Sequence, residues 1–121
     1  CPDLRIAIGH FGMVTRPDWK EQIRLARHSN VMIESGGITW LFNDEFYPFK
    51  GAVKAIREAA DLVGMEKLMW GSDYPHIEGG RDPIGKFESQ IGERSEAVRD
   101  EFYTDNFLDL MGTAGAHLAA A

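Results

Sequence analysis

The sequence predicts an α/β fold built on a parallel sheet, because three apolar runs of strand length alternate with helical stretches. The runs begin near residues 4, 31 and 67, so successive starts lie about one βα unit of ~31 residues apart. Parallel strands need a crossover of a dozen or more residues, which is usually a helix. The order and the spacing therefore indicate adjacent parallel strands.

The first unit combines a strand over 4–9 with a helix that opens at Pro17. The run 4–9 is apolar and leads into a turn that contains His10 and Gly12. Pro17 suits the first turn of a helix, where its missing N–H costs nothing. Three apolar side chains then recur at helical spacing, namely Trp19, Ile23 and Ala26. This stripe predicts a helix that packs against the sheet.

The second unit contains the clearest helix of the chain. Asn30 precedes a β-rich run over 31–34 that ends at Glu34, a residue to which we assign no role. A long aromatic loop is expected over 38–49. A stripe of small and apolar residues then predicts a helix with Gly64 as its C-cap. Its members are Ala52, Val53, Ile56, Ala59, Ala60 and Val63.

The third unit places a strand over 67–71 just before Asp73. Beyond it the sequence predicts, in order, a glycine-rich loop, a short helix and a final helical region, at 78–83, 84–91 and 95–111. The last residues are small and are expected to form a flexible tail. We therefore assign residues 1–112 to one partial domain and residues 113–121 to the tail.

Composition narrows the classes of partner. The 121 residues suffice for one domain with a core. With 19 acidic against 13 basic residues and no basic cluster interleaved with aromatics, we expect no nucleic-acid partner. No apolar run approaches the ~20 residues that span a bilayer, so we expect no membrane insertion. Cys1 is the only cysteine, which excludes an intrachain disulfide, and we expect a cytoplasmic protein.

Two polar side chains stand directly after predicted strands. His10 follows the first strand and Asp73 follows the third. In parallel α/β proteins, ligands bind at the carboxyl ends of the strands, so both are candidate site residues. Each also has a structural interpretation: Asp73 precedes a Tyr-Pro turn and can accept backbone N–H groups, and a single histidine is commonly a satisfied turn residue.

Two segments together resemble the last third of the amidohydrolase-2 family, the metal-dependent TIM-barrel hydrolases and decarboxylases. They are Pro2–Gly12 and Leu68–His76, and Asp105–Phe107 is similar to the Asn-containing terminal helix of that family. The resemblance implies the C-terminal part of a (β/α)8 barrel, with about three βα units and a closing helix. It also implies that Asp73 binds the catalytic metal or its water and that His10 is an acid/base group.

The resemblance implies a divalent metal cofactor, with zinc as the expected ion and manganese as an alternative. A divalent metal lowers the pKa of bound water, and Asp73 and His10 would act on that water as catalytic residues. The expected function is hydrolysis of a small, carboxylated or cyclic substrate. Two alternatives remain open: a metal-dependent decarboxylase of the same family and a non-catalytic α/β module for binding or assembly. The sequence contains no nucleotide-binding glycine motif.

Further candidate residues and partners follow from the loops and the chain start. Trp40, in the aromatic loop, and His76, three residues after Asp73, are candidate substrate-binding residues. The chain has no initial Met and enters a strand pattern almost at once, so we interpret it as a fragment. Three parallel strands leave open edges, which predicts a homo-oligomer or pairing with an N-terminal half that supplies the remaining metal ligands.

Overall fold

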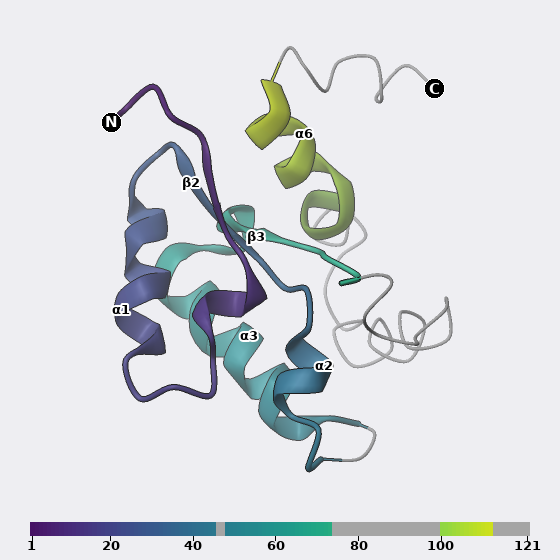
Figure 1. The fold of residues 1–121 in the computed structure, drawn as a ribbon. Helices are drawn as coiled ribbons and strands as arrows, with labels where there is room; N and C mark the ends of the chain where they lie inside the picture. Colours follow the sequence, from purple (N-terminus) through teal and green to yellow (C-terminus); the bar gives the residue numbers. More distant parts are fainter. Residues whose placement is uncertain (46–47, 74–99, 113–121) are drawn as a thin grey trace.

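The fold is a parallel three-stranded sheet with helices packed on it, in a computed structural model that describes residues 1–45, 48–73 and 100–112 (Figure 1). The strands are β1 (Ile6–Ile8), β2 (Val31–Glu34) and β3 (Leu68–Met69), in the order β1-β2-β3. Ile6 aligns with Val31 and Ile33 aligns with Leu68, both in parallel pairs. The predicted α/β class and strand direction are confirmed.

Two helices cover one face of the sheet. Helix α1 (Trp19–Arg24), continued by the 3-10 turn η2 (Leu25–Arg27), lies beside helix α3 (Lys50–Val63) in Figure 1. Both helices bury their apolar stripes against the strands. The fully buried core includes Ile23, Ala26, Ile33, Ala52, Ala59 and Leu68.

Helix α3 follows the predicted stripe. The buried positions Ala52, Ala55, Ile56 and Ala59 recur at three- and four-residue intervals, so they form one face. Gly64 ends the helix at φ +93°, a conformation that L-residues rarely adopt, and its N–H donates to the Ala60 carbonyl. The predicted C-cap is therefore confirmed.

The strand predicted over 31–34 is confirmed, the other two strands are shorter than predicted, and one short helix was missed. The run 4–9 forms strand only from Ile6, because pairing begins where the Ile6 N–H donates to the Asn30 carbonyl at 2.9 Å. The run 67–71 forms strand only over Leu68–Met69. Within the expected loop, the segment after Gly37 makes helix α2 (Ile38–Leu41).

The C-terminal segment is fixed to the outer edge of β3. A π-helical turn, η4 (Glu101–Asp105), runs into helix α6 (Asn106–Met111). The side chain of buried Asn106 donates to the carbonyls of Met65, at 3.1 Å, and Leu68, at 2.7 Å, where Met65 belongs to the 3-10 turn η3 (Met65–Lys67). The Trp70 N–H donates to the carbonyl of Phe102 at 2.8 Å.

Several expectations fall on residues outside the described ranges. They concern the short helix near 84–91, the beginning of the helical region 95–111 and the tail 113–121. In the ranges that are described, no helix is long and apolar enough to cross a membrane.

Candidate active site

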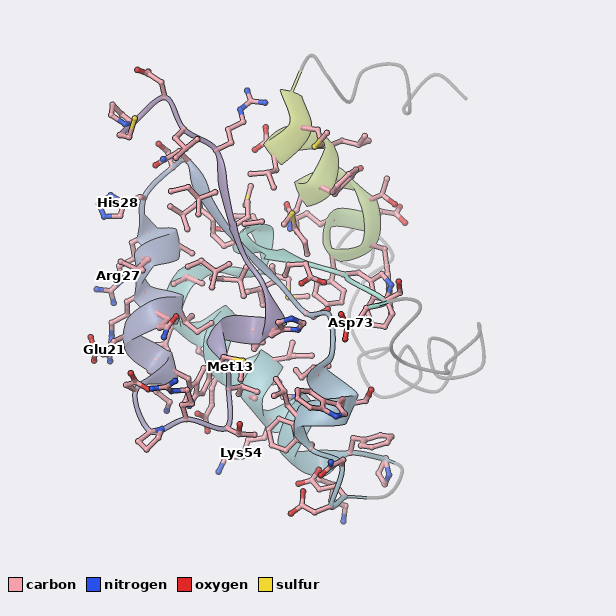
Figure 2. The ribbon with its side chains drawn as sticks, viewed as in Figure 1. Met13, Glu21, Arg27, His28, Lys54 and Asp73 are labelled. Carbon is pink, nitrogen blue, oxygen red and sulfur yellow. The ribbon has the colours of Figure 1, made fainter. Side chains whose placement is uncertain are left out.

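The carboxyl ends of the three strands carry the candidate residues. His10 begins the 3-10 turn η1 (His10–Gly12) after β1, and Asp73 follows β3. The turn 35–37, after β2, lies between them because β2 is the central strand. Figure 2 shows Asp73 at this end of the sheet, near the start of α2. In parallel α/β folds this is the end at which ligands bind.

His10 and Asp73 meet at Gly37. A Cβ atom placed on Gly37 would lie 2.9 Å from His10 Nδ1 and 3.2 Å from Asp73 Oδ2. Gly37 has φ +73°, in the left-handed region, so both the space and the backbone favour glycine there. The structure therefore brings the two predicted residues together at one end of the sheet, while their chemical roles stay predictions.

The imidazole of His10 is oriented by the backbone. Its Nδ1 lies 3.0 Å from the Gly36 carbonyl oxygen. A carbonyl only accepts hydrogen bonds, so Nδ1 donates, and the neutral ring carries its lone pair on Nε2. His10 is exposed, and Nε2 is the ring nitrogen that remains to bind an ion or accept a proton.

Left-handed backbone conformations concentrate at these two strand ends. His10 has φ 51°, Phe11 has φ 52° and Asp73 has φ 55°. Each non-glycine residue in this region costs roughly 1–2 kcal/mol, and such strain clusters where the surroundings fix a functional geometry. Phe11 is fully buried and its ring stacks near Trp19, so core packing holds the turn in place. This observation supports a functional interpretation of the two ends.

Glu34 and Ser35 belong to this end of the sheet, although sequence reasoning gave neither a role. The Glu34 carboxylate accepts the Gly36 N–H at 2.6 Å. Ser35 is fully buried, its Oγ accepts the Gly71 N–H at 3.2 Å, and its own N–H donates to the Met69 carbonyl at 3.0 Å. The only hint in the sequence is that glycines follow both strands, at Gly36 and Gly71.

The donors described here fit part of a metal site. His10 offers one nitrogen and Asp73 one carboxylate, whereas a catalytic zinc has three protein ligands and an open position. Over residues 1–45, 48–73 and 100–112, no group of three or more His, Cys, Asp or Glu side chains could hold a metal ion. Any ion bound here therefore needs donors beyond this set.

The two predicted substrate-binding residues differ in how the structure describes them. Trp40 lies on α2, three residues after Gly37, with 57% of its surface exposed. His76 lies outside the described residues. A cavity of about 340 Å³ does occur in the described part of the chain, but it is lined by residues near the amino ends of β1 and β2, such as Arg5 and Asn30, and by Asp109 and Leu110 of α6. It is therefore separate from the candidate site.

Comparisons with solved structures agree on the fold. A candidate 2-pyrone-4,6-dicarboxylic acid hydrolase from Pseudomonas putida is 28% identical over 91% of this chain, with a TM-score of 0.65. An amidohydrolase from Burkholderia multivorans with bound zinc is 19% identical over 88% of the chain, with a TM-score of 0.70. A candidate 2-pyrone-4,6-dicarboxylic acid hydrolase from Acinetobacter baumannii with citric acid bound is 21% identical over 89%, with a TM-score of 0.64.

The chain spans 44%, 43% and 43% of these three proteins, respectively, which is consistent with a partial TIM barrel. The comparison with curated proteins gives no match. A family model described as Amidohydrolase matches residues 1–110. The chain therefore belongs to this amidohydrolase family, Amidohydro_2.

Proposed function

We propose that this chain is the C-terminal part of a metal-dependent hydrolase that acts on small, carboxylated or cyclic substrates. The observation that carries the proposal is the meeting of His10 and Asp73 at Gly37, at the carboxyl ends of parallel strands. The alternative, a non-catalytic module, would be favoured by His10 and Asp73 on opposite sides of the fold, whereas both lie near Gly37. The remaining metal donors would come from an N-terminal half.

A divalent metal ion, when bound, lowers the pKa of the attacking water. Asp73 would be a ligand of the ion and would accept the proton of that water. His10 is suited to relay a proton, because its Nδ1 donates to the Gly36 carbonyl and Nε2 keeps its lone pair. Its Nε2 would take up the proton that Asp73 has accepted and then donate it to the leaving ring oxygen. In hydrolysis of a cyclic ester, water oxygen bonds to the carbonyl carbon and the ring C–O bond breaks.

The substrate class is inferred from the related structures and from the exposed aromatic surface. Two of them are described as hydrolases of a cyclic dicarboxylate, and one of these contains citric acid. These neighbours favour hydrolysis over decarboxylation, which could use the same two residues. Trp40 would offer a flat apolar surface to a ring, and its exposure and its position one turn after Gly37 support this role. We also assign His76 to substrate binding.

The proposal is tested on the full-length protein with 2-pyrone-4,6-dicarboxylate and a panel of carboxylated lactones, by following the loss of ring absorbance. We expect Asp73→Asn to abolish turnover and to reduce the bound divalent metal, measured by elemental analysis. We expect His10→Ala to lower kcat/KM at least ~100-fold, as loss of a positioned acid/base group does.

The matched control is His28→Ala. His28 is exposed after η2, and Figure 2 shows it on the opposite side of the molecule from Asp73. It should keep wild-type turnover and metal content. Near-normal turnover of folded Asp73→Asn and His10→Ala proteins would overturn the proposed roles.

A further inference from the structure

We propose that Glu34 is a positioning residue of the candidate active site: its carboxylate holds the turn 35–37 in the geometry that orients the His10 imidazole. The inference rests on the proposed function for the importance of His10. Glu34 itself would contact neither the substrate nor an ion.

A hydrogen bond joins the Glu34 carboxylate to the turn 35–37. Glu34 Oε1 accepts the Gly36 N–H at 2.6 Å, and a charge-assisted bond of this kind is stronger than one between neutral groups. A Cβ atom on Gly36 would overlap Glu34 Oε1 and would lie 3.0 Å from Oε2. Gly36 and the carboxylate thus fit against each other, and any side chain at Gly36 would displace the carboxylate.

The Glu34 carboxylate lies close to the ends of all three strands. A Cβ atom on Gly71 would overlap Glu34 Oε1, and one on Gly9 would lie 3.7 Å from Oε2. Gly9 directly precedes His10, and Gly71 lies two residues before Asp73. The Glu34 side chain therefore fills the space between the segments that lead to the two candidate catalytic residues.

Gly36 links the Glu34 carboxylate to the His10 imidazole. The residue whose N–H Glu34 binds, Gly36, is the residue whose carbonyl accepts from His10 Nδ1 at 3.0 Å. Ser35 anchors the same turn to β3 through its bonds with Met69 and Gly71. Removing the Glu34 carboxylate would release the Gly36 N–H, and the carbonyl that selects the Nδ1–H tautomer of His10 would lose its fixed position.

The test measures the His10 tautomer and turnover in the full-length protein, as purified and after chelation. Histidine-selective ¹⁵N labelling distinguishes Nδ1–H from Nε2–H at a pH where the ring is neutral, and His10→Gln identifies the His10 signal. We expect Nδ1–H in the wild type. In Glu34→Ala we expect a mixture of tautomers and a kcat reduced roughly 10–100-fold, with KM changed less than about threefold.

Two further variants keep the proposal testable if Glu34→Ala fails to fold. Glu34→Gln retains an oxygen that can accept the Gly36 N–H, so it should restore most of the Nδ1–H signal and of kcat. Gly36→Ala should displace the carboxylate and reproduce the effect of Glu34→Ala. The matched control is Glu45→Ala, because Glu45 accepts the Gly51 N–H at 2.8 Å at the start of α3, and we expect it to leave the His10 signal unchanged.

The outcomes separate this inference from the proposed function. An unchanged Nδ1–H signal in folded Glu34→Ala or Gly36→Ala protein would overturn the positioning role, even if kcat fell. An Nε2–H signal in the wild type would also overturn it. A changed tautomer in a protein that hydrolyses none of the substrates would uphold the positioning of His10 and contradict the proposed function instead.

Discussion

Gly37 offers the sharpest test of the site, because a single methyl group there reaches both candidate residues. The Cβ of Gly37→Ala would lie 2.9 Å from His10 Nδ1 and 3.2 Å from Asp73 Oδ2, so the imidazole must move. The alanine would also occupy φ +73°, at a cost of about 1–2 kcal/mol. Loss of the bond from Nδ1 to the Gly36 carbonyl adds about 0.5–1.5 kcal/mol.

We therefore expect Gly37→Ala to lower the free energy of unfolding by about 1.5–3.5 kcal/mol, measured by urea denaturation of the full-length protein. The effect on turnover should exceed what instability explains at a temperature where the variant is folded. A misplacement of about 1 Å in a reacting group can cost on the order of 100-fold in rate, and we expect a loss of kcat of that size.

The control is Gly64→Ala, which introduces at least as much backbone strain away from the site, because Gly64 has ψ 152° and Gly37 has ψ 2°. Gly64 has φ +93°, and the atoms nearest to its added methyl belong to the exposed Glu66 side chain, which can move aside. Gly64→Ala should lose at least as much stability as Gly37→Ala and keep its kcat. Equal kcat values for Gly37→Ala and Gly64→Ala would refute the conclusion that His10 and Asp73 act together at Gly37.

Two further predictions concern stability. Ile33 is fully buried in the core, so Ile33→Ala should cost about 2–5 kcal/mol of unfolding free energy, whereas Leu25→Ala, at a side chain that is 50% exposed, should change it by about 0.5 kcal/mol or less in denaturant titrations. Lys20, which hydrogen-bonds to Glu58 at 2.7 Å, holds the pKa of that carboxyl below its ordinary value of 4.5. The stabilisation from Glu58 is therefore present above pH 4.5 and lost as the pH falls through the lowered pKa, so the stability difference between wild type and Glu58→Gln should shrink on acidification. The difference should be smaller in a Lys20→Met background, where only Lys54 still pairs with Glu58.

The order of elements and the end of the sheet that carries the site could be predicted from local patterns. Apolar runs and helical stripes depend on residues that are near in sequence, and so the strand at 31–34 and the helix ending at Gly64 could be predicted. Helix α2 was missed because it has only four residues and starts after a left-handed glycine rather than a polar N-cap.

The supporting residues could not be predicted in this way, because their contacts join distant parts of the chain. Ser35 and Gly71 are 36 positions apart, and Asn106 is 38 positions from the Leu68 carbonyl that it binds. The sequence around a serine or a glutamate at the end of a strand does not indicate which backbone N–H will donate a hydrogen bond to it. Their roles become visible only when the strand ends are placed side by side.

The contacts on the outer side of β3 make the two edges of this sheet unequal. The Leu68 carbonyl accepts from Asn106 and the Trp70 N–H donates to Phe102, so the C-terminal segment already satisfies the groups that a neighbouring strand would need. In the described sheet, β1 pairs with β2 alone. We expect an incoming strand to add beside β1 first. Closure of a barrel at β3 would come last, because the terminal segment must exchange these bonds for strand pairing.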